Sequence, residues 1–316
     1  MRKSLPVVGY SPEEQELFDK FRAEKEIWVP PSAKAGAITY TAPPKSDIFS
    51  PSSFDEYIGQ ESAKDLAQIM VQAALNERRH LPNIMVVGEY GLGKTSLARI
   101  IMRAAGMPVL LYDGSSINKE FPDKSTFIID EIHNLESNVA DSLNIHLDNG
   151  KYHIIGCTNY PGKLPSAFRS RFRTIQLEPY QAKDLKIIAQ KICERKGVTS
   201  TSNALDLISQ RSRFNARQVI SYLSMIFDIM SVKSYPVLTE EVVHETFGKI
   251  GVDSKGLLPR DREYLRVIPD NRPVGLAYLS AILGIDDKTI EEEVEPYLLR
   301  LGLINRTPRG REKIEG

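Results

Sequence analysis

Short apolar runs alternate with amphipathic stretches between residues 49 and 180, and this alternation predicts an α/β fold. The runs are short and have no regular solvent-facing positions, which is typical of strands buried on both faces of a parallel sheet. We expect strands at 83–87, 109–112, 125–129, 153–157 and 174–177, and helices at 61–79 and 95–105. Strands separated by helices indicate crossover connections in a parallel sheet.

The strand pattern stops at Gln181, and helical periodicity replaces it. Helices are expected at 181–196, 202–211, 215–231 and 239–247, with Ser202 and Thr239 as candidate N-caps. These helices predict a small helical lid domain over residues 181–252. Residues 253–316 have the pattern of three helices followed by a short strand and a basic turn, which predicts a third domain.

Residues 1–48 differ from the rest of the chain. Ser11 to Trp28 has the pattern of a short helix, and a proline-rich segment over 30–44 follows it. We interpret this region either as a loose terminal tail or as an arm that docks on a neighbour or partner. The expected domains are therefore 1–48, 49–180, 181–252 and 253–316.

The charge balance limits how the chain can meet nucleic acid. It has 41 basic and 41 acidic residues, so any attraction to phosphate must come from a local basic patch. The two cysteines exclude a disulfide scaffold and suit a reducing compartment. The sequence has no apolar run long enough to cross a membrane and no secretory signal pattern, so we expect a cytoplasmic protein without a membrane partner.

The segment from Gly88 to Thr95 fits the phosphate-binding pattern G-x-x-x-x-G-K-[ST]. It follows a predicted strand and opens a predicted helix, where backbone N–H groups and the helix dipole both favour an anion. We expect Lys94 to reach the β- and γ-phosphates of ATP and Thr95 to offer its hydroxyl to Mg²⁺. The nucleotide-binding residues expected in this loop are Gly88, Gly91, Leu92, Gly93, Lys94, Thr95 and Ser96.

Two acidic residues end the third predicted strand and complete the expected site. Asp130 is expected to hold Mg²⁺, and Glu131 to orient and polarise the attacking water. His133 could be catalytic, although we favour a packing or helix-capping role.

Further polar residues have the spacing that a nucleotide-driven motor requires. Asn159 ends the fourth predicted strand, where it could touch the γ-phosphate or the attacking water. Arg169 and Arg171 precede the fifth strand and could stabilise charge on a neighbouring subunit's ATP, or could be ordinary surface arginines. Arg217 begins a lid helix and could couple the lid to the nucleotide.

Four segments together resemble the RuvB family of Holliday-junction branch-migration motors, which are AAA+ ATPases. They are 53–60, 88–95, 130–133 and 295–311, and the resemblance extends over about residues 49–312 in order. It implies an AAA+ P-loop domain, a helical lid and a C-terminal winged helix, in a hexameric ring that encircles duplex DNA. It assigns Walker A, Walker B, sensor 1, arginine-finger and sensor 2 roles to the residues above, and adenine contacts to Tyr57, Ile58 and Tyr180.

Three departures from the family stand out. The family has threonine where this chain has Asn159, and residues 1–48 have no counterpart. The segment between Glu131 and Asn159 is shorter, and only residues 147–152 remain where the family has a long β-hairpin that grips its partner RuvA. We therefore expect a partner protein other than standard RuvA. The segment from Asp113 to Ser125 is also short, so one helix before the Walker B strand is expected to be missing.

The C-terminal turn is the candidate DNA contact. Residues 300–313 hold five basic residues and one acid, whereas 286–295 holds six acids and one lysine. Arg306, Arg309 and Arg311 are expected to meet DNA phosphates from the wing, without reading bases. A solvated structural wing is the alternative. The two functional hypotheses are an ATP-driven DNA translocase and an ATP-switch loader that recruits a partner without processive movement.

Overall fold

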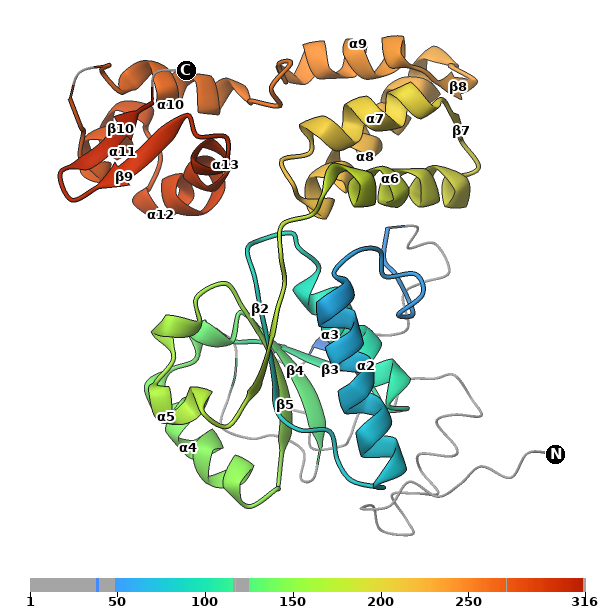
Figure 1. Cartoon of the computed structure of the whole chain (residues 1–316), viewed down its shortest axis with the longest axis vertical. Helices are drawn as coiled ribbons and strands as arrows, with labels where there is room; N and C mark the ends of the chain where they lie inside the picture. The colour runs from blue at the N-terminus through green and yellow to red at the C-terminus, as the bar shows by residue number, and fades with distance from the viewer. Residues whose placement is uncertain (1–37, 40–48, 116, 118–124, 271, 315–316) are drawn as a thin grey trace. The chain divides into compact units, whose positions relative to one another are not determined.

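The computed structural model describes residues 38–39, 49–115, 117, 125–270 and 272–314 (Figure 1). The predicted helix at 11–28 and most of the proline-rich segment lie outside these residues, as does most of the segment between Asp113 and Ser125. The chain divides into two units, Met1–Tyr180 and Gln181–Gly316.

A six-stranded sheet forms the centre of the first unit. The spatial order is β1-β3-β4-β5-β2-β6, and all neighbours are parallel except the two-residue edge strand β1, which is antiparallel to β3. The strands are β1 (Ile38–Thr39), β2 (Ile84–Val87), β3 (Leu110–Asp113), β4 (Thr126–Asp130), β5 (His153–Thr158) and β6 (Arg173–Gln176). The predicted parallel α/β sheet is confirmed.

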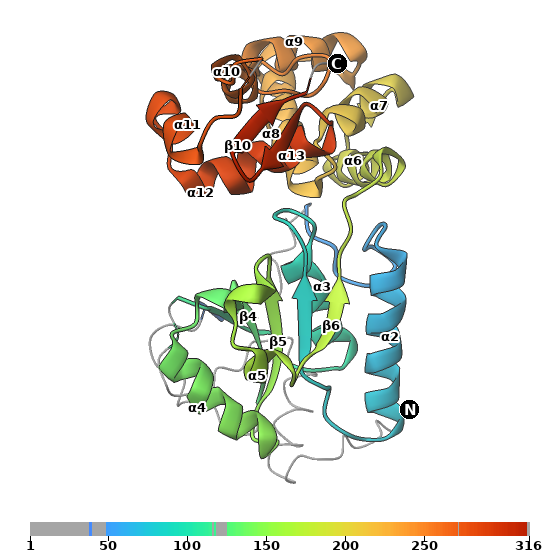
Figure 2. The same cartoon turned by 60° about the vertical axis from the view of Figure 1, so that its left-hand side comes forward.

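Helices cover both faces of this sheet (Figures 1 and 2). Helices α2 (Glu61–Asn76) and α3 (Lys94–Ala104) lie on one face, and α4 (Ser137–Asp148) lies on the other. Since successive strand side chains point to opposite faces, Phe127 and Ile129 pack toward α4 while Ile128 points the other way, and all three are fully buried. Each such side chain contributes about 1.5–3 kcal/mol by burial, which explains the apolar runs in the sequence.

Short elements complete the first unit at the ends of its strands. A 3-10 turn, η1 (Ile132–Asn134), follows β4, and a second, η2 (Pro161–Lys163), follows β5. The four-residue helix α5 (Ser166–Arg169) then leads into β6.

The first half of the second unit is helical, as the lid prediction requires. It contains α6 (Ala182–Lys196), α7 (Ser202–Arg211), α8 (Ala216–Lys233) and α9 (Glu240–Ile250), and a small parallel pair, β7 (Thr199–Ser200) and β8 (Val237–Leu238). The predicted cap Ser202 is wrong by one residue. Thr201 caps α7 by accepting a hydrogen bond from the backbone N–H of Ala204 at 3.3 Å, and Ser202 instead accepts one from Lys186.

The second half of this unit is a winged helix. Helices α10 (Pro259–Val267), α11 (Leu276–Leu283), α12 (Asp287–Thr289), the π-helical turn η3 (Ile290–Val294) and α13 (Glu295–Arg300) precede the hairpin of β9 (Ile304–Thr307) and β10 (Gly310–Lys313). Val274 pairs with Arg311 and extends the hairpin. Gly310 has a φ of 132°, and a Cβ there would come within 2.3 Å of the Val274 carbonyl oxygen. The glycine of the C-terminal motif is therefore required by this close approach.

Candidate nucleotide-binding and hydrolysis site

The phosphate-binding loop joins the end of β2 to the start of α3. Gly91 and Gly93 have φ values of 75° and 92°, which side chains rarely adopt, and Gly93 occupies the N-cap position of α3. A Cβ on Gly93 would also come within 2.9 Å of the Tyr57 hydroxyl. The two glycines therefore give the loop its tight curve, and the free N–H groups of the α3 N-terminus open into it.

Lys94 lies inside this loop, although a lysine would normally extend into solvent. It is only 6% exposed, and its Nζ donates to the carbonyl oxygens of Gly88 at 2.9 Å and Glu89 at 3.0 Å. An ammonium group held by the loop's own carbonyl oxygens can transfer to phosphate oxygens by a small rotation of the side chain. The predicted role of Lys94 fits this position.

The two predicted metal ligands lie together. The Thr95 hydroxyl, in the first turn of α3, donates to Oδ2 of Asp130 at the end of β4 at 2.8 Å. Hydroxyl and carboxylate oxygens are the ligands that Mg²⁺ prefers. The donor set therefore fits a magnesium ion bound beside the phosphate loop.

Glu131 has an unusual backbone conformation next to this pair. Its φ of 48° is in the left-handed region, which is strained for a residue with a side chain. The turn after β3 holds it there, because Gly114 donates its N–H to the Asp130 carbonyl oxygen at 2.8 Å, and a Cβ on Gly114 would come within 2.4 Å of the Glu131 carbonyl oxygen. Strain of about 1–3 kcal/mol at such a residue is typical of functional sites.

His133 links Glu131 to the neighbouring strand. Its ring is buried, and Nδ1 lies 3.3 Å from Oε2 of Glu131 and 3.0 Å from the hydroxyl of Thr158 at the end of β5. The packing role favoured from the sequence is therefore incomplete, since the imidazole also contacts the carboxylate expected to polarise water. The two-residue separation within a tight turn was the only sequence signal for this contact.

Asn159 follows Thr158 at the same edge of the sheet. Its amide oxygen is buried and has no hydrogen-bond partner among the residues described. Buried amide oxygens are normally paired, so an unpaired one at the end of β5 is suited to a ligand or to the attacking water. The sensor role expected for Asn159 stays a prediction.

The residues expected to contact adenine lie against the same loop. The buried Tyr57 hydroxyl donates to the carbonyl oxygens of Leu92 and Gly93 at 3.4 and 3.3 Å. Burial raises the pKa of the Tyr57 phenol well above its usual value, and the nearby phenol of Tyr180 raises it further. Gln60 ties this segment to the chain that follows β6 through hydrogen bonds of 2.6 and 2.9 Å with the backbone of Glu178. Ile58, between Tyr57 and Gln60, is partly buried.

The arginines near α5 have different environments. The Arg171 guanidinium binds both carboxylate oxygens of Asp148, at the end of α4, at 2.7 and 2.5 Å. This hydrogen bonding holds the pKa of the Asp148 carboxyl below its usual value. Arg169 is exposed and has no side-chain partner in the described ranges. Arg217 belongs to the second unit, as the second residue of α8.

The predicted DNA-contacting arginines also differ from one another. Glu295 is fully buried and accepts hydrogen bonds from Tyr264 at 2.7 Å, Arg306 at 2.5 Å and Arg311 at 2.8 Å. Burial raises the pKa of the Tyr264 phenol, and the bond to Glu295 raises it further. The Arg311 side chain is only 14% exposed, whereas Arg309, between β9 and β10, is exposed and without a side-chain partner in the described wing. The sequence grouped three arginines, but only Arg309 is free to meet a phosphate without losing a carboxylate partner.

Known proteins resemble the chain in both units. The model of the Holliday junction DNA helicase RuvB P-loop domain matches residues 49–155, and that of the RuvB C-terminal winged helix domain matches residues 254–314. The RuvB subunit of the Holliday junction branch migration complex from Campylobacter jejuni (strain RM1221) is 32% identical over 83% of this chain and 88% of its own length. The corresponding Thermotoga petrophila subunit is 32% identical over 84% and 89%. The solved structure of the Thermotoga maritima RuvB branch migration motor has a TM-score of 0.80 at 31% identity and covers 85% of this chain and 96% of that one. The chain therefore belongs to the RuvB family of AAA+ ATPases.

Proposed function

We propose that this chain is the subunit of an ATP-driven ring that translocates DNA and migrates Holliday junctions. The observation that carries the proposal is a phosphate-binding loop with the candidate nucleotide residues gathered beside it, in the same chain as a winged helix with an exposed arginine. In the first unit, Lys94, Thr95, Asp130, Glu131 and Asn159 all come from the end of a parallel strand or the helix start that follows it. No observation favours the alternative of a loader that only switches with ATP.

ATP and Mg²⁺ are the ligands that we propose for this site. Mg²⁺, when bound with ATP, would neutralise charge on the phosphates, and Thr95 and Asp130 would hold it. Lys94 would bind the terminal phosphates, and Glu131 would orient the attacking water and accept its proton at a carboxylate oxygen. His133 would fix the direction of that carboxylate, and Asn159 would sense the γ-phosphate. Arg217 is proposed as the sensor that couples the lid to the nucleotide.

The proposed ring follows from the arginines. Arg171 is bound to Asp148 at the end of α4, and we propose that it, with Arg169 beside it, serves the ATP of the neighbouring subunit in a homohexamer. Hydrolysis would then require assembly. No helix in the described ranges has the length and apolarity needed to cross a membrane. The expected cytoplasmic location stays a prediction.

Our proposal about the partner protein depends on a single observation. Helix α4 ends at Asp148 and β5 begins at His153, so residues 149–152 are the whole connection where the family has its RuvA-binding hairpin (Figure 2). The comparisons give no support to a partner other than RuvA. A different or absent partner is therefore our proposal from the short connection alone.

The test is the steady-state ATPase rate without DNA, with linear duplex and with a four-way junction, each with and without RuvA, together with a branch-migration assay. We expect DNA to stimulate turnover and the junction to migrate without RuvA. Migration only with RuvA would reject the changed partner but keep the motor. Stimulated turnover with no migration under either condition would favour the loader.

Replacing Arg309 and Arg311 by alanine should affect different properties, DNA binding in the first case and stability in the second. Arg309→Ala is expected to weaken DNA binding and to lower the slope of log K against log salt by about 0.9, as the loss of one phosphate contact requires, with unchanged thermal stability. Arg311→Ala is expected to destabilise the winged helix by about 3 kcal/mol, because the buried Glu295 carboxylate loses a partner. Salt-dependent binding isotherms and thermal unfolding measure the two effects. Equal loss of DNA affinity at unchanged stability in both variants would contradict this division of roles.

A further inference from the structure

The turn between α7 and α8 has a strained backbone. Arg213 and Phe214 are consecutive residues with φ values of 56° and 57°, both in the left-handed region that favours glycine. Directly after them, Asn215 caps α8 by accepting the backbone N–H groups of Arg217 at 2.8 Å and Gln218 at 3.4 Å. The strained turn is therefore fixed to the helix start that carries the proposed nucleotide sensor. Such strain persists only where surrounding contacts enforce it.

The contacts that enforce it come from the winged helix. The Arg213 guanidinium is 10% exposed and forms two hydrogen bonds, of 2.9 and 3.3 Å, with the carboxylate of Asp261 in α10, which is 2% exposed. It also donates to the Glu293 carbonyl oxygen at 3.0 Å and lies over the Tyr297 ring at 4.6 Å from its centroid. A buried guanidinium with a carboxylate, a carbonyl oxygen and an aromatic face is fully committed to these partners.

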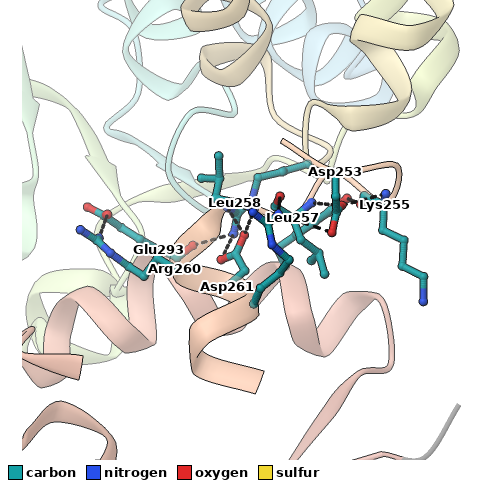
Figure 3. Close-up of polar contacts among 10 residues, drawn as sticks. Asp253, Lys255, Leu257, Leu258, Arg260, Asp261 and Glu293 are labelled. Carbon is teal, nitrogen blue, oxygen red and sulfur yellow. Dashed lines mark hydrogen bonds and ion pairs between the residues drawn. The ribbon is translucent and has the colours of Figure 1, made fainter. Parts of the chain in front are cut away.

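Asp261 is fixed from its other side by the start of its own helix. Oδ2 also accepts the Leu258 backbone N–H at 2.7 Å, so the carboxylate lies back over the first turn of α10 (Figure 3). Moving Arg213 relative to α10 would leave this buried carboxylate without its charged partner, which is costly. The pair therefore resists sliding or rotation between the lid and the winged helix.

The segment that joins the lid to the winged helix also takes part in the contact between them. The Asp253 carboxylate accepts the backbone N–H groups of Lys255 and Leu257, both at 2.9 Å (Figure 3). The Tyr297 hydroxyl donates to the Lys255 carbonyl oxygen at 2.7 Å. A Cβ on Gly256, whose φ is 76°, would come within 2.8 Å of that hydroxyl and 3.0 Å of the Arg211 carbonyl oxygen. The connection is thus packed between lid and winged helix and does not behave as a free linker.

We propose that Arg213 is a positioning residue that makes the lid and the winged helix move as one body. Rotation of α8 when Arg217 senses the nucleotide would then be delivered to the wing that contacts DNA. The inference rests on the proposed function, because it assigns a path between ATP and DNA movement. A nucleotide-sensing role for Arg213 itself is disfavoured, since its guanidinium is committed to Asp261 and Glu293.

The first test measures rigidity and does not depend on activity. Spin labels at Val232→Cys in α8 and Ile282→Cys in α11 lie on exposed positions, 85% and 51% exposed, whereas the native Cys157 and Cys193 are buried. The distances between the two labels in the full chain, measured by pulsed electron–electron double resonance, should form one narrow distribution. Arg213→Ala and Asp261→Asn should each broaden it, and Arg213→Lys should give an intermediate width because lysine keeps the charge but not the two-pronged geometry.

The matched control is Arg260→Ala. The Arg260 side chain pairs with the Glu293 carboxylate at 3.7 Å within the winged helix, and the two side chains are 49% and 68% exposed (Figure 3). This ion pair includes no lid residue, and Arg213 contacts only the backbone carbonyl oxygen of Glu293. The control should keep the narrow distribution. Equal widths in wild type, Arg213→Ala and Asp261→Asn would overturn the proposed rigid joint.

The second test measures coupling in unlabelled full-length rings. In Arg213→Ala we expect the DNA-free ATPase rate and DNA affinity to stay within about twofold, while base pairs migrated per ATP fall about tenfold. The loss of the charged partner of Asp261 is expected to lower the unfolding temperature in either case, but a merely structural role would lower every activity together and leave this ratio unchanged. Broadened distances with an unchanged ratio would overturn transmission through Arg213. If the wild-type ring migrates no junction, the proposed function fails. The readout for Arg213 is then the stimulation of the ATPase rate by DNA, which should fall about tenfold in Arg213→Ala.

Discussion

Glu131→Gln is expected to yield a chain that binds ATP and assembles normally but hydrolyses ATP at least about a hundredfold more slowly. The amide has the shape of the carboxylate but cannot accept a proton from the attacking water, and general-base catalysis of this kind is worth about 10²–10⁴-fold. Glutamine should tolerate the left-handed backbone as glutamate does, so the fold should not change. Single-turnover hydrolysis, nucleotide affinity and the oligomeric state in ATP measure the three parts of this expectation.

Glu136→Gln is the matched control for this variant. Glu136 is the exposed residue just before α4, close in sequence to the site but outside its contacts, and its loss should leave turnover unchanged. Hydrolysis at the wild-type rate in Glu131→Gln would show that the Walker B assignment is wrong. A large loss of ATP affinity would instead mean that Glu131 acts mainly in binding.

The features that the sequence predicted well are those that depend on neighbouring residues. Strands buried on both faces need continuous apolar residues, so the strands of the parallel sheet could be predicted from the sequence. Their predicted ends differ by only about one residue from those observed. The phosphate loop could also be predicted, because glycines with positive φ, a lysine and a residue with a hydroxyl group must follow one another at fixed spacing. Thr95 and Asp130 were paired correctly because both lie at the same edge of a parallel sheet.

The features that the sequence missed depend on residues brought together from distant elements. Arg309 and Arg311 are two positions apart, yet one is exposed between the strands of the hairpin and the other is paired with the buried Glu295 from another element. Composition of the turn cannot separate them, since the separation depends on what packs against β10. The left-handed backbone of Arg213 was equally hidden, because the carboxylate that its guanidinium binds, Asp261, lies 48 residues away in the sequence.

The contact at the short connection after α4 also joins residues that are distant in the sequence. The sequence showed that this segment is short, and the structure places Asp148, its first anchoring residue, in a two-pronged ion pair with Arg171. The end of α4 is thus fixed to the element that carries the candidate arginine finger. This link gives the final prediction a structural basis that the sequence alone lacked.

Arg171→Ala is expected to bind ATP with unchanged affinity but to lose turnover by about 10³-fold, the lower end of the contribution of an arginine finger. The reason is that Arg171 would act on the neighbouring subunit's ATP, so its own binding loop would remain intact. Arg173→Ala, at an exposed position in β6 two residues further on, is the control and should keep the wild-type rate. Arg169→Ala decides which arginine of the pair is required, and we expect a loss well below that of Arg171→Ala.

Mixing variants tests whether Arg171 acts between subunits. Arg171→Ala subunits keep an intact Lys94 site, and Lys94→Ala subunits keep an intact arginine, so an active site can form only where the first faces the second. In an equal mixture, about a quarter of the interfaces in a closed ring should have this arrangement, and the ATPase rate should rise clearly above that of either variant alone. No recovery in rings that demonstrably exchange subunits would mean that Arg171 serves its own subunit. The pair with Asp148 would then be part of the site that it completes.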